Sequence, residues 1–259
     1  ETGSGERAGR EMDRITSAKN PLVQQLRALR RGAVGDLMAV EGRVMILEAL
    51  SCGLAPHYAL LEEEFPQGEL AEALTRAGAR VYWAPRALLE SVCAAKTPQG
   101  SCCAFEMVPP RLPAGSRIVA LDGVQDPGNV GTIWRTADAA GFGGILLGTG
   151  CAGPENPKVI RASMGSCFRL PYEKVPDLGA RLGDLAASGM AVVVSALDGE
   201  DVYKRTPLGD AFVLVIGSEA RGASRGVKAQ ATHRFRLPMR GGAESLNAAV
   251  AAGILMYEL

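Results

Sequence analysis

The feature that most constrains the fold is the C-terminal run from residue 212 to residue 259. It opens with five consecutive apolar residues at 212–216, a pattern typical of a strand buried on both faces of a parallel sheet. A glycine-containing loop, a short helix and a second brief strand at 234–237 follow, and Pro238 ends that strand. After a Gly-Gly loop, the chain closes with a helix at 246–259. This helix is rich in alanine, so it can lie very close to another backbone.

The residues before this run predict the rest of a parallel α/β sheet. A buried strand at 118–124 leads through a loop into a helix at 130–140, and a second strand follows at 144–147. The pattern continues with a helix at 157–161, a strand at 169–174, a helix at 178–187 and a strand at 190–196. In such a sheet, ligands bind by default at the carboxyl ends of the strands.

A nicotinamide-dependent oxidoreductase is the obvious alternative for a fold of this kind. Its dinucleotide site needs Gly-x-Gly-x-x-Gly directly after the first strand. The loop here reads Asp122-Gly123-Val124-Gln125-Asp126-Pro127-Gly128-Asn129, which does not match. The glycine-rich first loop of the common methyltransferase sheet is missing as well, so neither class is favoured.

Three motifs, in order, resemble those of the SpoU (TrmH-type) RNA ribose methyltransferases of the SPOUT class. The first is Asn129-Val130-Gly131-Thr132-Ile133-Trp134-Arg135-Thr136-Ala137, and the second is Ile216-Gly217-Ser218-Glu219-Ala220-Arg221-Gly222. The third is Leu237-Pro238-Met239 together with Ser245-Leu246-Asn247-Ala248-Ala249. One motif alone would be a weak signal, whereas three in order are specific. The chain departs from the family at Ala220-Arg221 and Ala248-Ala249, where other residues are frequent.

The resemblance implies an α/β protein with a C-terminal trefoil-knotted SPOUT methyltransferase domain at 117–259. A smaller N-terminal α/β domain at 11–110 is expected to bind the substrate. A linker is expected at 111–116, because the stretch 108–115 is rich in proline. Residues 1–10 are expected to be a disordered tail that includes residues added in cloning. Members of the class work as homodimers through the C-terminal domain, and we expect the same here.

The implied reaction is methyl transfer from S-adenosylmethionine to a ribose 2′-hydroxyl of RNA. By resemblance, the donor site is assigned to Gly217, Leu237, Met239, Ser245 and Leu246. The resemblance assigns catalysis to Asn129, Arg135, Glu219, Ser245 and Asn247. Simpler interpretations stay open, because Asn129, Ser245 and Asn247 could be helix caps.

Arg135 is implied to act on the 2′-hydroxyl across a dimer interface. A guanidinium has a pKa above about 12 and is a poor base at neutral pH. It could instead orient a phosphate or stabilise the developing alkoxide. The structural alternative is an ion pair with Asp138, three residues further along the same helix.

Basic residues gather in two acid-free stretches, 14–31 and 220–243, although the net charge of the chain is zero. Such patches suit a partner that carries phosphates, although solvated faces remain the alternative. The candidate RNA contacts are Arg14, Lys19, Arg30, Arg31, Lys158, Arg161 and Arg221. The segments 15–21, 41–42 and 96–100 also resemble the substrate-binding domain of ribosomal-RNA members, so ribosomal RNA is the expected partner.

Composition limits the other functions. Six scattered cysteines without a Cys-x-x-Cys pair and only two histidines predict no metal site, no disulfide framework and no histidine-based catalysis. No apolar run approaches the roughly 18 residues of a membrane span, and no secretory signal is visible. We therefore expect a cytoplasmic enzyme without a membrane partner. The alternatives are a tRNA 2′-O-methyltransferase and an inactive RNA-binding homologue.

Overall fold

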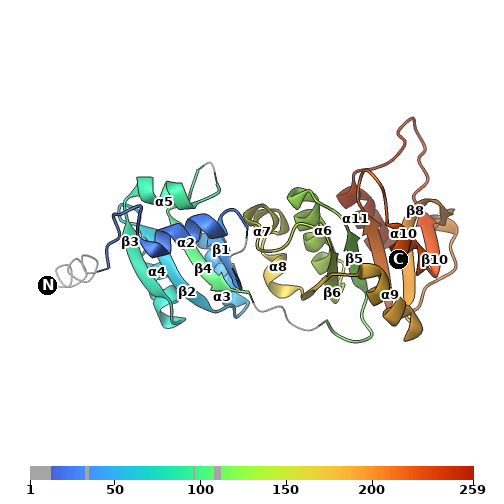
Figure 1. The fold of residues 1–259 in the computed structure, drawn as a ribbon, viewed down its shortest axis with the longest axis horizontal. Helices are drawn as coiled ribbons and strands as arrows, with labels where there is room; N and C mark the ends of the chain where they lie inside the picture. Colours follow the sequence, from blue (N-terminus) through green and yellow to red (C-terminus); the bar gives the residue numbers. More distant parts are fainter. Residues whose placement is uncertain (1–12, 33–34, 96, 108–111) are drawn as a thin grey trace. The chain divides into compact units, whose positions relative to one another are not determined.

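The computed structural model describes residues 13–32, 35–95, 97–107 and 112–259. The chain divides into two compact units, each built around its own sheet (Figure 1). One unit runs to Val108 and includes Pro154–Ile160, and the other contains Pro109–Gly153 and Arg161–Leu259. The expected tail at 1–10, Lys96 and the first residue of the expected linker lie outside the described residues. The domain boundaries given above stay a prediction.

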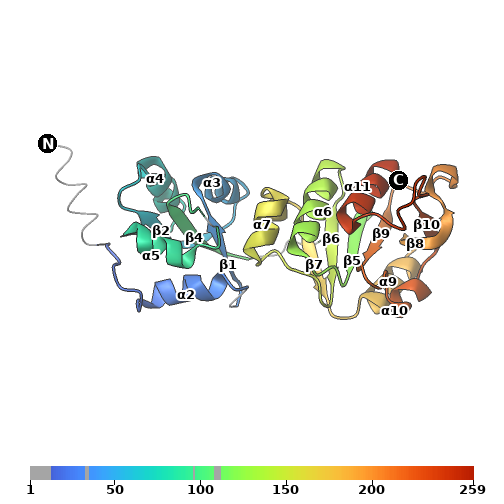
Figure 2. The same ribbon diagram turned by 90° about the horizontal axis from the view of Figure 1, so that it is seen from above.

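The first unit is a four-stranded mixed sheet with helices on both faces. Its strands are β1 (Leu37–Glu41), β2 (Pro56–Glu62), β3 (Arg80–Ala84) and β4 (Ser101–Glu106), in the order β1-β4-β2-β3. Its helices are α2 (Pro21–Leu29), α3 (Arg43–Ser51), α4 (Gly68–Arg76) and α5 (Arg86–Val92). Figure 2 shows α2 and α5 on one face of the sheet and α3 and α4 on the other. Leu26, Leu60 and Leu89 are buried between α2, α5 and the sheet.

The second unit is a six-stranded sheet in which every neighbouring pair is parallel. The strands are β5 (Ile118–Asp122), β6 (Gly144–Gly148), β7 (Tyr172–Val175), β8 (Ala191–Asp201), β9 (Phe212–Gly217) and β10 (His233–Arg236). Their order is β10-β8-β9-β5-β6-β7. The parallel α/β sheet predicted from the strand–loop–helix–strand pattern is therefore confirmed.

Two pairs of helices cover this sheet, namely α6 (Pro127–Ala139) with α11 (Ala248–Glu258) and α9 (Leu178–Ala187) with α10 (Arg225–Ala229). The other helices are α7 (Pro157–Ser163), whose residues up to Ile160 belong to the first unit, and α8 (Ser166–Arg169), and a 3₁₀ turn lies at Val202–Lys204. Figure 2 places α6 and α11 on one face and α9 and α10 on the other. The burial of β9 is nearly complete, as its five apolar residues predicted.

Strand order reverses between β5 and β9, because β5 continues to β6 and β7 on one side while β8 and β10 lie on the other. Asp122 at the end of β5 is in register with Gly217 at the end of β9. Crevices at such a switch point, outside the carboxyl ends of the strands, are the usual binding sites of open α/β sheets.

Several predicted bounds were wrong for local reasons. The strand predicted at 169–174 begins only at Tyr172, because Gly165 adopts φ +83° and starts the short helix α8 instead. Helix α6 begins at Pro127 rather than residue 130, because the Asp126 side chain caps it and Pro127 occupies its first turn. Helix α11 begins at Ala248 rather than residue 246, because Asn247 is its cap.

Strand β8 extends to Asp201, five residues beyond its predicted end. A Cβ at Gly199 would lie 2.7 Å from the backbone of Arg234, so β8 and β10 approach there as only glycine allows. Among the described residues, no helix is long and apolar enough to cross a membrane.

Candidate active site

A pocket of about 750 Å³ opens in the second unit at the carboxyl ends of β8, β9 and β10. All five residues predicted to hold the methyl donor line it, namely Gly217, Leu237, Met239, Ser245 and Leu246. Glu219, Arg221 and Asn247 line it as well. The structure thus brings the second and third motifs together, although they are separated in sequence by α10 and β10.

The first wall of the pocket is the loop after β9, residues 217–224. The N–H of Gly222 donates to the carbonyl of Ser218 over 2.8 Å, which closes the loop into a tight turn. A Cβ at Gly217 would lie 2.1 Å from the backbone nitrogen of Ala223, so no other residue fits there. The close approach at Gly217 is thus made by the backbone of Gly222 and Ala223 in the same loop.

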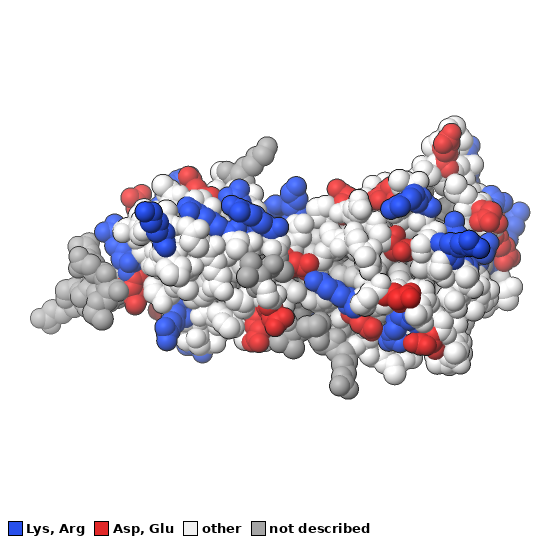
Figure 3. Space-filling view, viewed as in Figure 1, with Lys and Arg blue, Asp and Glu red and all other residues white. Residues whose placement is uncertain are grey.

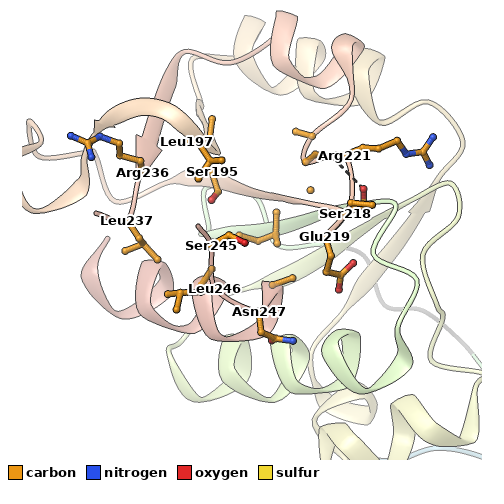
Figure 4. A pocket seen from close by; sticks show the side chains of 18 of the residues that line it. Ser195, Leu197, Ser218, Glu219, Arg221, Arg236, Leu237, Ser245, Leu246 and Asn247 are labelled. Carbon is orange, nitrogen blue, oxygen red and sulfur yellow. Dashed lines mark hydrogen bonds between the residues drawn. The ribbon is translucent and has the colours of Figure 1, made fainter. Parts of the chain in front are cut away.

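The second wall is apolar and comes from the chain around α11. Leu237 and Met239 follow β10, and Leu246 precedes α11 with 38% of its surface exposed. In Figure 4, Leu237 and Leu246 lie on the same side of the pocket, while Arg221 and Arg236 extend away from it on opposite sides. An apolar slot edged by loop backbone suits a planar heterocycle such as adenine.

Asn129 joins all three motifs through its side-chain amide. Its Nδ2 donates to Oε1 of Glu219 over 2.5 Å, and its Oδ1 accepts from Nδ2 of Asn247 over 3.0 Å. The cap of α6 is Asp126, whose carboxylate accepts from the N–H of Asn129. The interpretation of Asn129 as a helix cap was therefore wrong.

Asn247 has two structural roles besides lining the pocket. Its Oδ1 accepts from the backbone N–H groups of Ala249 and Val250, so it caps α11, while its Nδ2 reaches Asn129. The cap and the link to Asn129 therefore coexist in one residue. Ser245 lines the pocket, and its side chain does not cap α11.

Arg135 is exposed on α6 and does not line the pocket of its own chain. Asp138, its alternative partner, pairs instead with Arg169, at 2.8 Å between Nη2 and Oδ2. Within the described part of the chain, no hydrogen bond or ion pair engages the Arg135 guanidinium. The structure leaves this cation available to a ligand or a second molecule.

The candidate RNA contacts are distributed over several elements. Arg14 makes a two-pronged ion pair with Glu63, at 2.6 and 3.0 Å, and Arg30 donates to the carbonyl of Ser91. Arg31 follows α2, Lys19 precedes it, and both are exposed. Lys158 and Arg161 lie on α7, and Arg221 lies at the pocket.

Sequence reasoning missed Ser195, Leu197 and Asp198 in β8, and also Lys228 and Arg236, which all line the pocket. The carboxyl-end rule for parallel sheets could have found the three residues of β8, which lie in the middle and C-terminal half of that strand. Cys151 lies near this edge, but burial raises the pKa of its thiol, which donates to the carbonyl of Leu121. It therefore stays protonated at neutral pH and is not poised as a nucleophile.

Comparisons with known proteins identify relatives that span nearly the whole chain. Residues 116–257 match the model of the SpoU rRNA Methylase family. The 23S rRNA (guanosine(2553)-2′-O)-methyltransferase RlmP of Bacillus subtilis is 32% identical over 252 residues, which cover 96% of this chain and 99% of the relative.

Solved structures agree with this result. The AdoMet-bound rRNA methyltransferase from Sinorhizobium meliloti is 32% identical and superposes with a TM-score of 0.83, covering 95% of this chain and 96% of its own. The SpoU methyltransferase AviRb from Streptomyces viridochromogenes, in complex with AdoMet, is 28% identical with a TM-score of 0.83. That match covers 93% of this chain and 97% of the AviRb chain.

Proposed function

The chain belongs to the SpoU rRNA methylase family, and on that premise we propose that it methylates a ribose 2′-hydroxyl of ribosomal RNA. The methyl donor is S-adenosylmethionine, as the three motifs predicted. Two relatives that span both units, from Bacillus subtilis and Sinorhizobium meliloti, are named as rRNA methyltransferases, which favours ribosomal RNA over tRNA.

The observation that carries the proposal is the convergence of the motifs on one pocket. Five donor-site candidates line it, and Asn129 bonds to two further motif residues that also line it. Its volume of about 750 Å³ lies within the range of small-molecule sites, and its apolar wall suits adenine. These features also weigh against an inactive RNA-binding homologue, for which the polar links would be unnecessary.

When bound, the donor supplies a methyl group on a positively charged sulfur. The residues of this chain must then hold the ribose in line with that methyl and stabilise the oxygen that attacks it. Glu219, Asn129 and Asn247 fix the positions of the two pocket loops relative to α6. We assign to Arg135 the orientation of the RNA and the stabilisation of the developing alkoxide, because a guanidinium is a poor base.

Arg135 does not line the pocket of its own chain, so it acts at the donor pocket of a second copy of the chain. The face of α11 supports such a homodimer, because it exposes an apolar row of Val250, Ile254 and Tyr257, which are 51%, 36% and 69% exposed. Leu246 continues this row to the pocket itself. A second copy on the face of α11 and α6 would cover the row and would place its own Arg135 near the pocket.

We also infer the trefoil knot. Strand β10 lies at the edge of the sheet, whereas α11 packs against α6 and β9 near its centre. The connection between them, residues 237–247, must therefore return across the carboxyl ends, where it shares the pocket with the loop 217–224. Threading of the last helix past that loop accounts for this path.

The first unit is proposed to bind the RNA. Figure 3 shows basic side chains gathered over the region of α2 and α5 in this unit, with few acidic ones among them. Arg30 and Arg31 at the end of α2 and Lys19 before it are the candidates for phosphate contacts. Arg14 must exchange its ion pair with Glu63 to join them. We place the activity in the cytoplasm, where ribosomal RNA would be available.

Calorimetric titration with S-adenosylmethionine tests the donor site. Leu246→Arg should abolish binding because it places a charge in the apolar slot. Val44→Arg, a matched change at a residue of α3 that is 68% exposed, should bind like the wild type. Wild-type protein that is folded but binds no donor, with or without ribosomal RNA, would contradict the proposal.

A further inference from the structure

The loop that forms the first wall of the pocket is held at two points, by Asp122 at the end of β5 and by Asn129 in the first turn of α6. Near its start, Glu219 accepts from Asn129 over 2.5 Å. At its end, the backbone N–H of Ser224 donates to Oδ2 of Asp122 over 2.6 Å. The two contacts flank residues 220–223, all of which line the pocket.

We propose that Asp122 is a positioning residue for the methyl-donor site, and this inference rests on the function proposed above. Asp122 is the last residue of β5, and its register partner is Gly217, the first residue of the loop. One strand end therefore holds both ends of the loop, through the sheet at Gly217 and through a carboxylate at Ser224. The three motifs of the sequence do not include Asp122.

The chemistry of the contact supports this role. A carboxylate that accepts from a backbone N–H forms a charge-assisted bond, about twice as strong as a neutral one. Ser224 is the cap residue of α10, yet its side chain makes no cap hydrogen bond, so the cap of this short helix does not fix the end of the loop. Asp122 supplies the external acceptor.

The loop is sensitive to small shifts at this point. A Cβ on Gly217 would lie only 2.1 Å from the backbone nitrogen of Ala223, so the two ends of the loop are in close contact. A release at Ser224 lets Gly222 and Ala223 move away from Gly217, and both residues line the pocket. We therefore expect weaker donor binding, while the sheet and the first unit stay intact.

Two variants remove the same bond from opposite sides. Asp122→Ala removes the acceptor, and Asp122→Asn keeps one acceptor oxygen without the charge. Ser224→Pro removes the N–H donor at φ −65°, a value that proline adopts. The matched control is Asp177→Ala, because Asp177 is an exposed aspartate of the same unit that accepts from the N–H of Ala180 over 3.0 Å and does not line the pocket.

Hydrogen exchange without donor measures the loop directly. We expect the amides of residues 217–224 to exchange about tenfold faster in Asp122→Ala. This is the change in rate that the loss of one charge-assisted hydrogen bond would cause. Asp177→Ala should leave these amides unchanged. Equal exchange of this loop in wild type and Asp122→Ala overturns the inference, whether or not the protein methylates RNA.

Calorimetry with S-adenosylmethionine then tests the consequence. The Kd should rise about tenfold in Asp122→Ala and in Ser224→Pro, and no further in the double variant, because both remove one bond. Asp122→Asn should recover most of the affinity, and RNA binding should not change in any of them. Additive losses in the double variant, or a loss as large in Asp177→Ala, overturn the inference. A wild type that binds no donor contradicts the proposed function instead.

Discussion

The side-chain amide of Asn247 donates to Oδ1 of Asn129 over 3.0 Å, which joins two residues that are 118 positions apart. The Nδ2 of Asn129 donates to Glu219, so the Asn129 amide is oriented by a donor, Asn247, and an acceptor, Glu219. A residue with an acceptor at one end and a donor at the other is required here, and asparagine provides both.

Asn129→Asp should therefore impair the enzyme more than Asn129→Ala. The new carboxylate keeps the acceptor for Asn247 but faces the carboxylate of Glu219 at the former hydrogen-bond distance of 2.5 Å, where like charges repel. The double variant Asn129→Asp/Glu219→Gln should recover activity, because it restores a donor–acceptor pair. Steady-state methyl transfer measures this, and the absence of any recovery would contradict the proposed link.

Gly217→Ala should lower donor affinity and stability together. Its Cβ would lie 2.1 Å from the backbone nitrogen of Ala223, so the loop must move, at a cost of about 1–3 kcal/mol. Gly226→Ala is the matched control, since a Cβ there meets nothing within 4 Å. Thermal unfolding and calorimetry should separate the two variants, and equal behaviour would show that the tight turn is unimportant.

Arg135 should act in the pocket of the partner subunit. Arg135→Ala and Leu246→Arg are each expected to be inactive, yet an equal mixture allowed to exchange subunits should regain activity. Random pairing leaves one intact site in each mixed dimer, which predicts about a quarter of the wild-type rate. A mixture that stays inactive although mixed dimers are detected would place Arg135 in its own chain's site.

The dimer itself has a separate test. Ile254→Glu puts a charge in the exposed apolar row of α11 and should yield monomers in light scattering. Val44→Glu changes an exposed apolar residue of the first unit and should leave the wild-type mass unchanged. A wild-type protein that is monomeric at micromolar concentration would contradict the homodimer.

The first unit should lose stability in alkaline solution. Burial raises the pKa of the Tyr58 hydroxyl and of the Cys103 thiol, and a hydrogen bond with Cys93, with burial, raises the pKa of Cys102. The folded unit thus holds these protons more tightly than the unfolded chain does. The resulting stability is complete below the unfolded pKa values, about 8.5 for Cys and about 10 for Tyr, and is lost as pH rises above them.

Urea unfolding followed by Trp83 fluorescence, in a Trp134→Phe background, reports on this unit within the whole chain. The urea concentration at the unfolding midpoint should decrease as the pH is raised beyond about 8.5. Tyr58→Phe should make this decrease smaller above about pH 10. A midpoint that stays constant to pH 11 would contradict the assignment of these three protons to the folded state.

The parallel sheet could be predicted because it depends on local patterns, such as the apolar run at 212–216 that specifies β9. The pocket residues Gly217, Leu237 and Leu246 were assigned by resemblance to the family motifs, and all three line the pocket. The partners of these residues could not be predicted in the same way. That Asn129 bonds to Glu219 depends on strand order, because the two residues meet only when β9 pairs with β5.

Contacts between side chains and backbone atoms could not be predicted from the sequence either. The role of Asp122 depends on the N–H of Ser224, which carries no sequence signal. Helix α8 was missed because its start depends on the left-handed conformation of Gly165, whereas the residues after it have a strand-like composition. Asp138 was a plausible partner of Arg135 by spacing alone, but the fold brings Arg169 closer.

The most direct test of the central claim is transfer of tritium from methyl-labelled S-adenosylmethionine to ribosomal RNA, followed by nucleoside analysis. We predict that wild-type protein and Val44→Arg yield a 2′-O-methylated nucleoside, and that Leu246→Arg yields none. Label in a base rather than in a ribose, or transfer by Leu246→Arg at the wild-type rate, would contradict the account.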